Sequence, residues 1–385
     1  MTEAPPKIKA RFPILSRFAE ALAPHPSDNP WLDLLRTFAI LLVLARHAPR
    51  QINAGPAVSW WEKATLNGWI GVDLFFVLSG YLVTSGLFRE LRANGKINIA
   101  QYATRRILRI VPAYYFVLLL VITGYFPFFP VSSENLVVRT GYHILFLQDY
   151  FPSDINIVFW SLGVEAKFYA IIPLLLLFVL SLRTWPKILA VGLAVAMTSP
   201  LIRTVLFVTE DFNDNLIFWS DLRSPFYACL EPLVFGFLIA IAHDYGFTRF
   251  SPRTGLYLLA TTLFALSFLL GYHDLLAQTD WWDYTLQPLI IATLFSALLI
   301  AAINLKQVHL PLEPVFRFGA RISYSLYLVH FPLGPLSILL SKNFDLGPAW
   351  SWVIYLGISL VHAIFIAVFI EYPFMKRKVP ETRPF

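Results

Sequence analysis

The stretch IIPLLLLFVLSL at Ile171–Leu182 decides the fold, because it is apolar on every side apart from Ser181. A second stretch of the same kind, LIIATLFSALLIAAI, occupies Leu289–Ile303. A strand of a membrane barrel would alternate apolar and polar residues over about ten positions, and neither stretch does. Lipid offers the backbone no hydrogen-bond partners, so a crossing segment of this kind must be a helix. Both stretches therefore predict membrane-spanning helices.

The whole chain has the composition of a multi-pass membrane protein. Of its 385 residues, 57% are hydrophobic and 14% are charged, and the mean hydropathy is +0.63. A soluble domain would carry roughly 25% charged residues. Apolar runs of about 18 residues or more, long enough to span a bilayer, recur along the chain. We therefore expect an all-α bundle of about ten transmembrane helices. The predicted spans are residues 32–48, 69–88, 110–127, 157–180, 187–208, 223–243, 254–272, 284–304, 320–340 and 348–371.

The distribution of charge predicts the orientation of this bundle. Lys and Arg gather in alternate connections such as residues 89–109 and 306–321, whereas acidic residues gather in the others. The positive-inside rule then places both termini in the cytoplasm and the protein in the bacterial inner membrane. Retention of basic residues on that side accounts for the net charge of +6, so no nucleic-acid partner is needed. We expect a flexible cytoplasmic tail (1–30), a transmembrane domain (31–373) and a basic cytoplasmic tail (374–385).

Three ionisable side chains, His47, Asp73 and Glu165, lie at a similar depth in the outer half of three predicted spans. Ionisable groups inside a membrane are costly and mark functional sites. A carboxylate beside His47 would fix the imidazole tautomer and raise its basicity, as in a general-base dyad. The alternative interpretation is structural: His47 snorkels to the outer headgroups and Asp73 caps its helix.

Arginines gather toward the opposite, cytoplasmic side. Arg36 precedes His47 by about three helical turns, which is roughly 16 Å of rise on one face of the helix. Arg105 and Arg106 each share a helical face with Arg109. Guanidinium groups presented in this way suit phosphate. Ordinary anchoring of the chain by positive residues at the inner surface is the alternative.

One further pattern of polar residues completes the candidate site. Ser323, Tyr327 and His330 form one stripe of the ninth predicted span, where an unpaired polar group would be expensive. His330 is either a catalytic group or a structural one bonded to a tyrosine. No pair of His and Glu has the spacing of a metal motif such as H-E-x-x-H, and no G-x-S-x-G element occurs. We expect no metal site and no serine nucleophile.

Five motifs in a fixed order make the chain resemble the acyltransferase-3 family of membrane acyltransferases, from Trp31 to Pro373. The motifs are LDxLR at 32–36 followed by His47, GVDLFFVLSGY at 71–81, RxxRIxP at 106–112, WSLxxExxFY at 160–169 and ISYSLYLxHFP at 322–332. The chain departs from the family pattern at Leu34 and Thr37, where small residues are usual. These departures concern local packing and leave the chemistry-bearing positions intact.

The resemblance implies a ten-helix bundle that takes an acyl group, usually acetyl, from cytoplasmic acyl-CoA. The acceptor would be a carbohydrate or glycolipid hydroxyl of the cell envelope. In the family, the residues corresponding to Arg36 and His47 are needed for activity. The catalytic candidates are then His47, Asp73, Glu165 and His330. The donor-binding candidates are Arg36, Arg105, Arg106 and Arg109, and the supporting candidates are Ser79, Trp160, Ser323 and Tyr327.

Two questions stay open at the level of sequence. His47 acts either as a general base or as a transient acyl carrier. A different class of function, a transporter of a glycan or a small anionic solute, would also bury charges along a substrate path, although two matched halves with broken helices are not evident.

Overall fold

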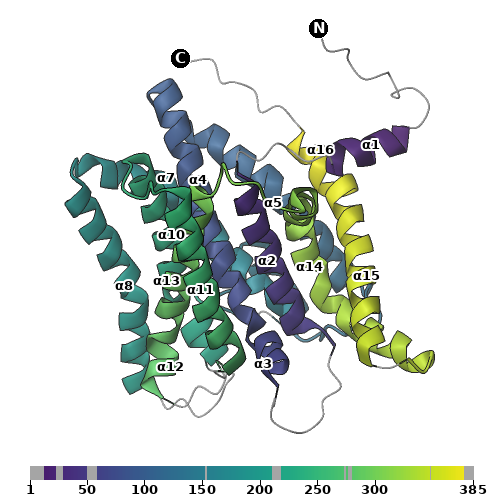
Figure 1. The fold of residues 1–385 in the computed structure, drawn as a ribbon. Coiled ribbons are helices and arrows are strands. Elements are labelled where there is room, and N and C mark those ends of the chain that lie inside the picture. Colours follow the sequence, from purple (N-terminus) through teal and green to yellow (C-terminus); the bar gives the residue numbers. More distant parts are fainter. Residues whose placement is uncertain are drawn as a thin grey trace.

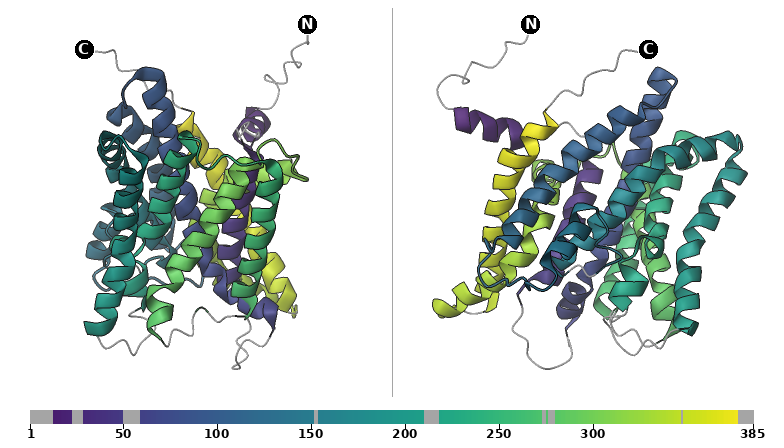
Figure 2. Two further views of the ribbon diagram at one scale, coloured as in Figure 1. Left: turned by 60° about the vertical axis from the view of Figure 1, so that its left-hand side comes forward. Right: turned by 180° about the vertical axis from the view of Figure 1, so that it is seen from behind.

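The computed structural model describes residues 13–22, 29–49, 59–151, 154–209, 218–272, 275, 280–346 and 348–376, and within them every regular element is helical. The long helices run side by side between two ends of the bundle (Figure 1). Helices α1 and α16 lie at one end, which we call the α1 end, and α3 and α12 lie at the other, the α3 end. Figure 2 shows that α1 and the last helix share an end in both rotated views.

The helices follow one another in chain order. Their bounds are α1 Pro13–Leu22, α2 Pro30–His47, α3 Trp60–Leu66, α4 Gly71–Asn94, α5 Ile99–Ile122, α6 Leu136–Ile144, α7 Trp160–Ser181, α8 Trp185–Thr209, α10 Leu230–Asp244, α11 Pro252–Tyr272, α12 Trp281–Thr285, α13 Gln287–Asn304, α14 Glu313–Asn343, α15 Pro348–Ile366 and α16 Tyr372–Met375. Short 3-10 or π turns join several of them, among them η2 Asn67–Ile70, η3 Ile157–Phe159, η4 Phe218–Arg223, η5 Phe226–Ala228 and η6 Ala367–Glu371.

Seven of the described helical segments are long and apolar enough to cross a membrane, and the chain is an all-helical, multi-pass membrane protein. Each of the ten predicted spans overlaps a helix, although the bounds of some differ by five residues or more. Three of these helices fall short as spans by length or composition: α2 and α5 each carry several charged residues, and α10 is only 15 residues long. Ten crossings therefore stay a prediction.

The connection expected at residues 89–109 is mostly helix. Helix α4 continues to Asn94, and Gly95 ends it in the left-handed conformation at φ 68°, which glycine adopts without strain. Helix α5 begins at Ile99, where the Asn98 side chain caps it by accepting from Gln101 N. Arg105, Arg106 and Arg109 therefore project from a continuous helix. The predicted third span began eleven residues later because hydropathy does not register the polar first turns of a helix.

The predicted tails lie largely outside the described residues, at 1–12, 23–28 and 377–385. Within the first tail, α1 forms a helix, and its Ala21 carbonyl accepts a hydrogen bond from Arg321 Nε at 2.8 Å. Near the other terminus, Lys376 Nζ lies 2.7 Å from the Glu20 carboxylate. The two ends of the described chain thus meet at the α1 end.

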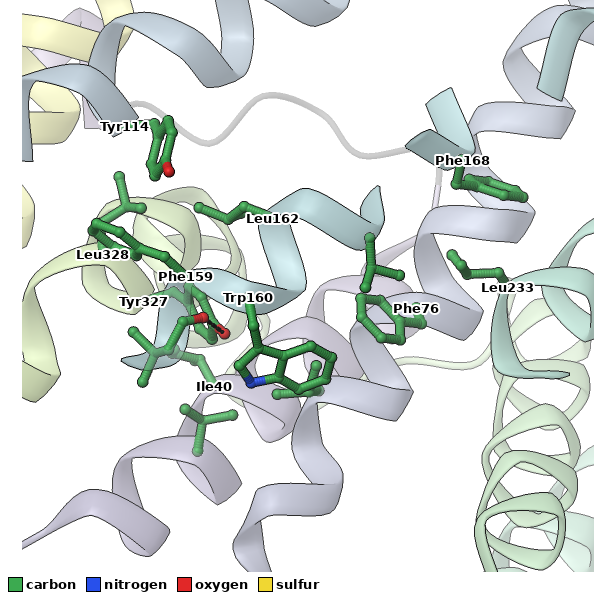
Figure 3. Packing of buried hydrophobic residues seen from close by; sticks show 14 of the residues in the cluster. Ile40, Phe76, Tyr114, Phe159, Trp160, Leu162, Phe168, Leu233, Tyr327 and Leu328 are labelled. Carbon is green, nitrogen blue, oxygen red and sulfur yellow. Dashed lines mark hydrogen bonds between the residues drawn. The ribbon is translucent and has the colours of Figure 1, made fainter. Parts of the chain in front are cut away.

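Helix α4 is the central element, with α10 on one side and α2 on the other. Two glycines permit the contact with α10: a Cβ on Gly80 would lie 2.2 Å from Leu233 O, and one on Gly236 would lie 2.1 Å from Val77 O. The backbones therefore touch. On its other side α4 contributes to the main apolar cluster, which also takes side chains from α2, α5, α7 and α14. Figure 3 shows part of it, with Trp160 of α7 between Tyr327 of α14 and Phe76 of α4.

Candidate functional site

A cavity of about 280 Å³ lies between α2, α4, α5, α7 and α14. It gathers most of the polar residues that the sequence singles out, although they come from five separate helices. The predicted site residues that line it are Arg36, Ser79, Arg106, Arg109, Glu165, Ser323 and Tyr327. Seven of the twelve candidates, from five helices, thus meet in one cavity.

One part of the cavity is strongly cationic. Arg36 lies 3.6 Å from Asp33. The Arg106 guanidinium lies over the Tyr102 and Tyr169 rings at 5.8 and 5.7 Å, and its buried Nε has no hydrogen-bond partner among the described residues. Arg109 makes no hydrogen bond or ion pair within the same part of the chain. These cations have donor capacity left for an anion.

One arginine predicted for the site lies outside the cavity, and another arginine that was not predicted lines it. Arg105 does not line the cavity; its Nη2 lies 2.6 Å from Glu90, and its side chain is 43% exposed. Arg89 of α4 lines the cavity instead. Helical periodicity could have identified Arg89, since Phe75, Ser79 and Arg89 fall on one face of α4. Sequence reasoning placed Arg89 in a connection and so did not apply that periodicity.

Glu165 belongs to the cationic part of the cavity. Ser79 Oγ donates to its carboxylate at 2.6 Å, and Tyr169 Oη donates to Ser79 Oγ at 3.2 Å. These bonds tie α4 to α7. The expected pairing of Glu165 with His47 is therefore replaced by a hydrogen bond with Ser79, a supporting residue that sequence reasoning did name.

His47 and His330 form a pair beyond Tyr327, with His330 Nε2 3.1 Å from His47 Nδ1. The backbone fixes their tautomers. His330 Nδ1 lies 2.7 Å from Tyr327 O, and since a carbonyl only accepts, Nδ1 carries the hydrogen and Nε2 of the neutral ring accepts. His47 Nδ1 then donates, both to His330 and to Val43 O at 3.1 Å. In this tautomer the ring lone pair of His47 is on Nε2.

Asp73 has a different partner from the one expected. It forms a buried ion pair with Arg223 at 2.8 Å. The Arg223 guanidinium also lies over the rings of Trp160 and Trp69, at 5.0 and 5.2 Å, and Cys229 Sγ donates to Arg223 O at 2.9 Å. The expected orienting role of Asp73 toward His47 is thus filled by His330. Arg223 was missed because it stands at the edge of a predicted span, where an arginine is ordinary.

Tyr327 separates the cavity from the histidine pair. Its hydroxyl donates to Val158 O at 2.6 Å and lies 2.6 Å from Ser161 Oγ. Its ring centroid is 5.7 Å from that of His330, while the same side chain lines the cavity. Ser323, one turn earlier, bonds its own helix at Ala320 O. Tyr327 therefore couples the two halves of the candidate site.

The loop after α6 is fastened to α7 next to this site. Lys167 Nζ donates to Asp149 and to Phe146 O, and Phe226 N donates to the other Asp149 oxygen at 3.2 Å. Burial raises the pKa of Asp149, and Lys167 opposes that shift. Lys167 therefore holds the loop after α6 against α7, and Asp149 in that loop is also bonded to η5.

Comparison with known proteins adds two findings. A family model described as an acyltransferase domain matches residues 29–370. The chain is also similar to O-acetyltransferase OatA of Staphylococcus aureus (strain NCTC 8325 / PS 47), 27% identical over 374 residues that cover 91% of this chain and 58% of the relative. Peptidoglycan O-acetyltransferase OatA of Listeria monocytogenes serovar 1/2a (strain ATCC BAA-679 / EGD-e) is 28% identical over 375 residues, covering 90% and 56%.

These relatives are longer than the matched region. The chain spans a little under three fifths of the length of the curated relatives it matches. No solved structure matches it.

Proposed function

The chain belongs to the acyltransferase-3 family, and from that premise we propose that it is a membrane O-acyltransferase that moves an acyl group from acyl-CoA to a carbohydrate hydroxyl. Acetyl is the proposed group, because the relatives are named O-acetyltransferases. A cell-wall glycan is the proposed acceptor, by analogy with the Listeria relative. The observation that carries the proposal is the arginine-lined cavity that adjoins a histidine pair.

We place the α1 end in the cytoplasm and the protein in the bacterial inner membrane. Ten crossings bring both termini to that side, and the basic connections support this arrangement. The arginines of the cavity enter from helix segments near the α1 end: Arg36 is two turns into α2, and Arg89 lies near the end of α4. The donor would then enter from the compartment in which acyl-CoA is made.

Arg36, Arg89, Arg106 and Arg109 are proposed to bind the phosphates of the CoA. Phosphate oxygens form strong, charge-assisted bonds with guanidinium groups. One oxygen of the Glu165 carboxylate is already bonded to the Ser79 hydroxyl. The pantetheine arm would lie along the cavity toward Tyr327, and no metal is assigned a part.

His47 is proposed to act at the far end of the arm. As a general base, its Nε2 takes the proton of the acceptor hydroxyl while that oxygen attacks the thioester carbonyl. The carbon–sulfur bond then breaks, and the CoA thiolate takes the proton back from His47. Alternatively, Nε2 itself attacks and forms an acyl-imidazole, which the hydroxyl cleaves. In both routes His330 is a positioning residue, because it holds the Nδ1 hydrogen of His47.

The test uses the protein in liposomes with radiolabelled acetyl-CoA and soluble cell-wall glycan fragments. Free CoA and labelled ester should appear together in equal amounts. His47→Ala should lower turnover by about 10²–10⁴-fold, the usual contribution of a general base. His362→Ala is the matched control, since this histidine sits on α15 and bonds Ile358 O in its own helix.

Two outcomes would contradict the proposal. Release of no CoA in the presence of acceptor would favour a transporter. Full turnover by His47→Ala would remove the histidine from the chemistry.

A further inference from the structure

The inner end of the cavity differs in character from its cationic part. Four apolar side chains line it there, Val72, Phe75 and Phe76 of α4 and Leu162 of α7. They lie in the first turns of their helices, on the α3 side of Ser79 and Glu165. A thioester arm that is bound by its phosphates would present its acyl group to this apolar part.

Phe75 and Tyr327 both line that end and contact each other. Their ring centroids are 6.4 Å apart with an angle of 74° between the planes, an edge-to-face contact. Tyr327 is not free to swing, because its hydroxyl is bonded to both Val158 O and Ser161 Oγ. The edge-to-face contact in turn holds Phe75. The pair forms a fixed part of the cavity wall.

The length of the cavity decides how much room is left in front of the wall. Phe75 and Arg89 are four turns apart on one face of α4, about 21 Å of helical rise. An extended pantetheine arm has about a dozen bonds and spans roughly 16 Å. With the phosphates at the arginines, the thioester reaches within a few bond lengths of Phe75. A two-carbon acyl group fits there, and a long chain meets the ring.

We propose that Phe75 is the residue that limits the donor to short acyl groups, because its ring occupies the apolar part of the cavity. This inference rests on the proposed function, because it concerns the same donor site. It assigns Phe75 a role in specificity rather than in the chemical step.

The experiment measures kcat/KM for acetyl-, butyryl- and hexanoyl-CoA with the full chain in liposomes. Wild-type efficiency should fall steeply with chain length. Phe75→Ala should raise the hexanoyl-to-acetyl ratio of kcat/KM by about tenfold or more. Each methylene that an apolar pocket accommodates raises kcat/KM by roughly tenfold or more. Phe264→Ala is the matched control: Phe264 lies on α11 and is 77% exposed, so its ratio should equal that of the wild type.

A second variant guards against misfolding of the first. Phe75→Leu keeps an apolar side chain and should give an intermediate ratio. An unchanged ratio in both variants, with wild-type turnover intact, would overturn the role of Phe75 and leave the proposed function standing. Absence of transfer from any thioester by the wild type would overturn the proposed function, and this inference with it.

Discussion

At the scale of single residues, the backbone sets the chemistry of the two histidines. Tyr327 O fixes the hydrogen of His330, and that tautomer lets His330 accept from His47. Thr37, where the family favours a small residue, is accommodated by the facing helix: its hydroxyl donates to Phe316 O at 2.9 Å, and Gly319 leaves it room. A substitution on α2 is thus matched by a glycine on α14.

The arginines give the sharpest residue-level prediction. Arg109→Ala should raise the KM for acetyl-CoA about ten- to hundredfold, because a hydrogen bond to a charged group contributes about 1.5–3 kcal/mol. Arg105→Ala, on the same helix but paired with Glu90 outside the cavity, should change KM less than twofold. Steady-state kinetics against acetyl-CoA at saturating acceptor measures both. Equal effects of the two substitutions would show that general positive charge, not the cavity, binds the donor.

Much of the site could be predicted from spacing, but its pairings could not. Arg36 and His47 share a face of one helix, and Arg106 and Arg109 another, so local periodicity was sufficient. The partner of a buried charge depends on which helices meet. His47 is hydrogen-bonded to His330 instead of Asp73, and Asp73 forms an ion pair with Arg223. Sequence separation carries no information on such contacts.

At the scale of elements, the α4–α10 crossing holds the cavity wall in place. Hydropathy predicted both helices, although α10 begins at Leu230, seven residues after the predicted start of its span. It misplaced the start of α5, where caps at Gly95 and Asn98 and not apolarity set the boundary. The close approach of α4 to α10 depends on two glycines that no periodicity argument distinguishes from others.

Gly80→Ala should therefore destabilise the protein. The new Cβ would meet Leu233 O at 2.2 Å, and overpacking against backbone costs about 1–3 kcal/mol. Gly86→Ala, two turns along the same helix, has no atom within 4 Å of its new Cβ and should be neutral or slightly stabilising. Thermal unfolding in detergent compares the two variants. A Gly80→Ala protein as stable as the wild type would mean that this crossing is looser than described.

At the scale of the whole molecule, the two parts of the candidate site lie toward opposite ends of the bundle. Arg36 and Arg89 lie in the halves of α2 and α4 nearer the α1 end, whereas His47 is the last residue of α2, toward the α3 end (Figure 1). The membrane character of the chain follows from composition alone. The proposed sidedness of the reaction rests on the positions of the arginines relative to the basic connections.

The decisive measurement is turnover in sealed proteoliposomes with acetyl-CoA confined to one side. A Lys96→Cys variant reports orientation through an impermeant maleimide, because Lys96 lies in the turn between α4 and α5 and the native Cys229 is buried. We expect CoA release only when acetyl-CoA is supplied on the side at which Lys96→Cys is labelled. Equal release with the donor confined to the opposite side would contradict a donor site that opens at the α1 end.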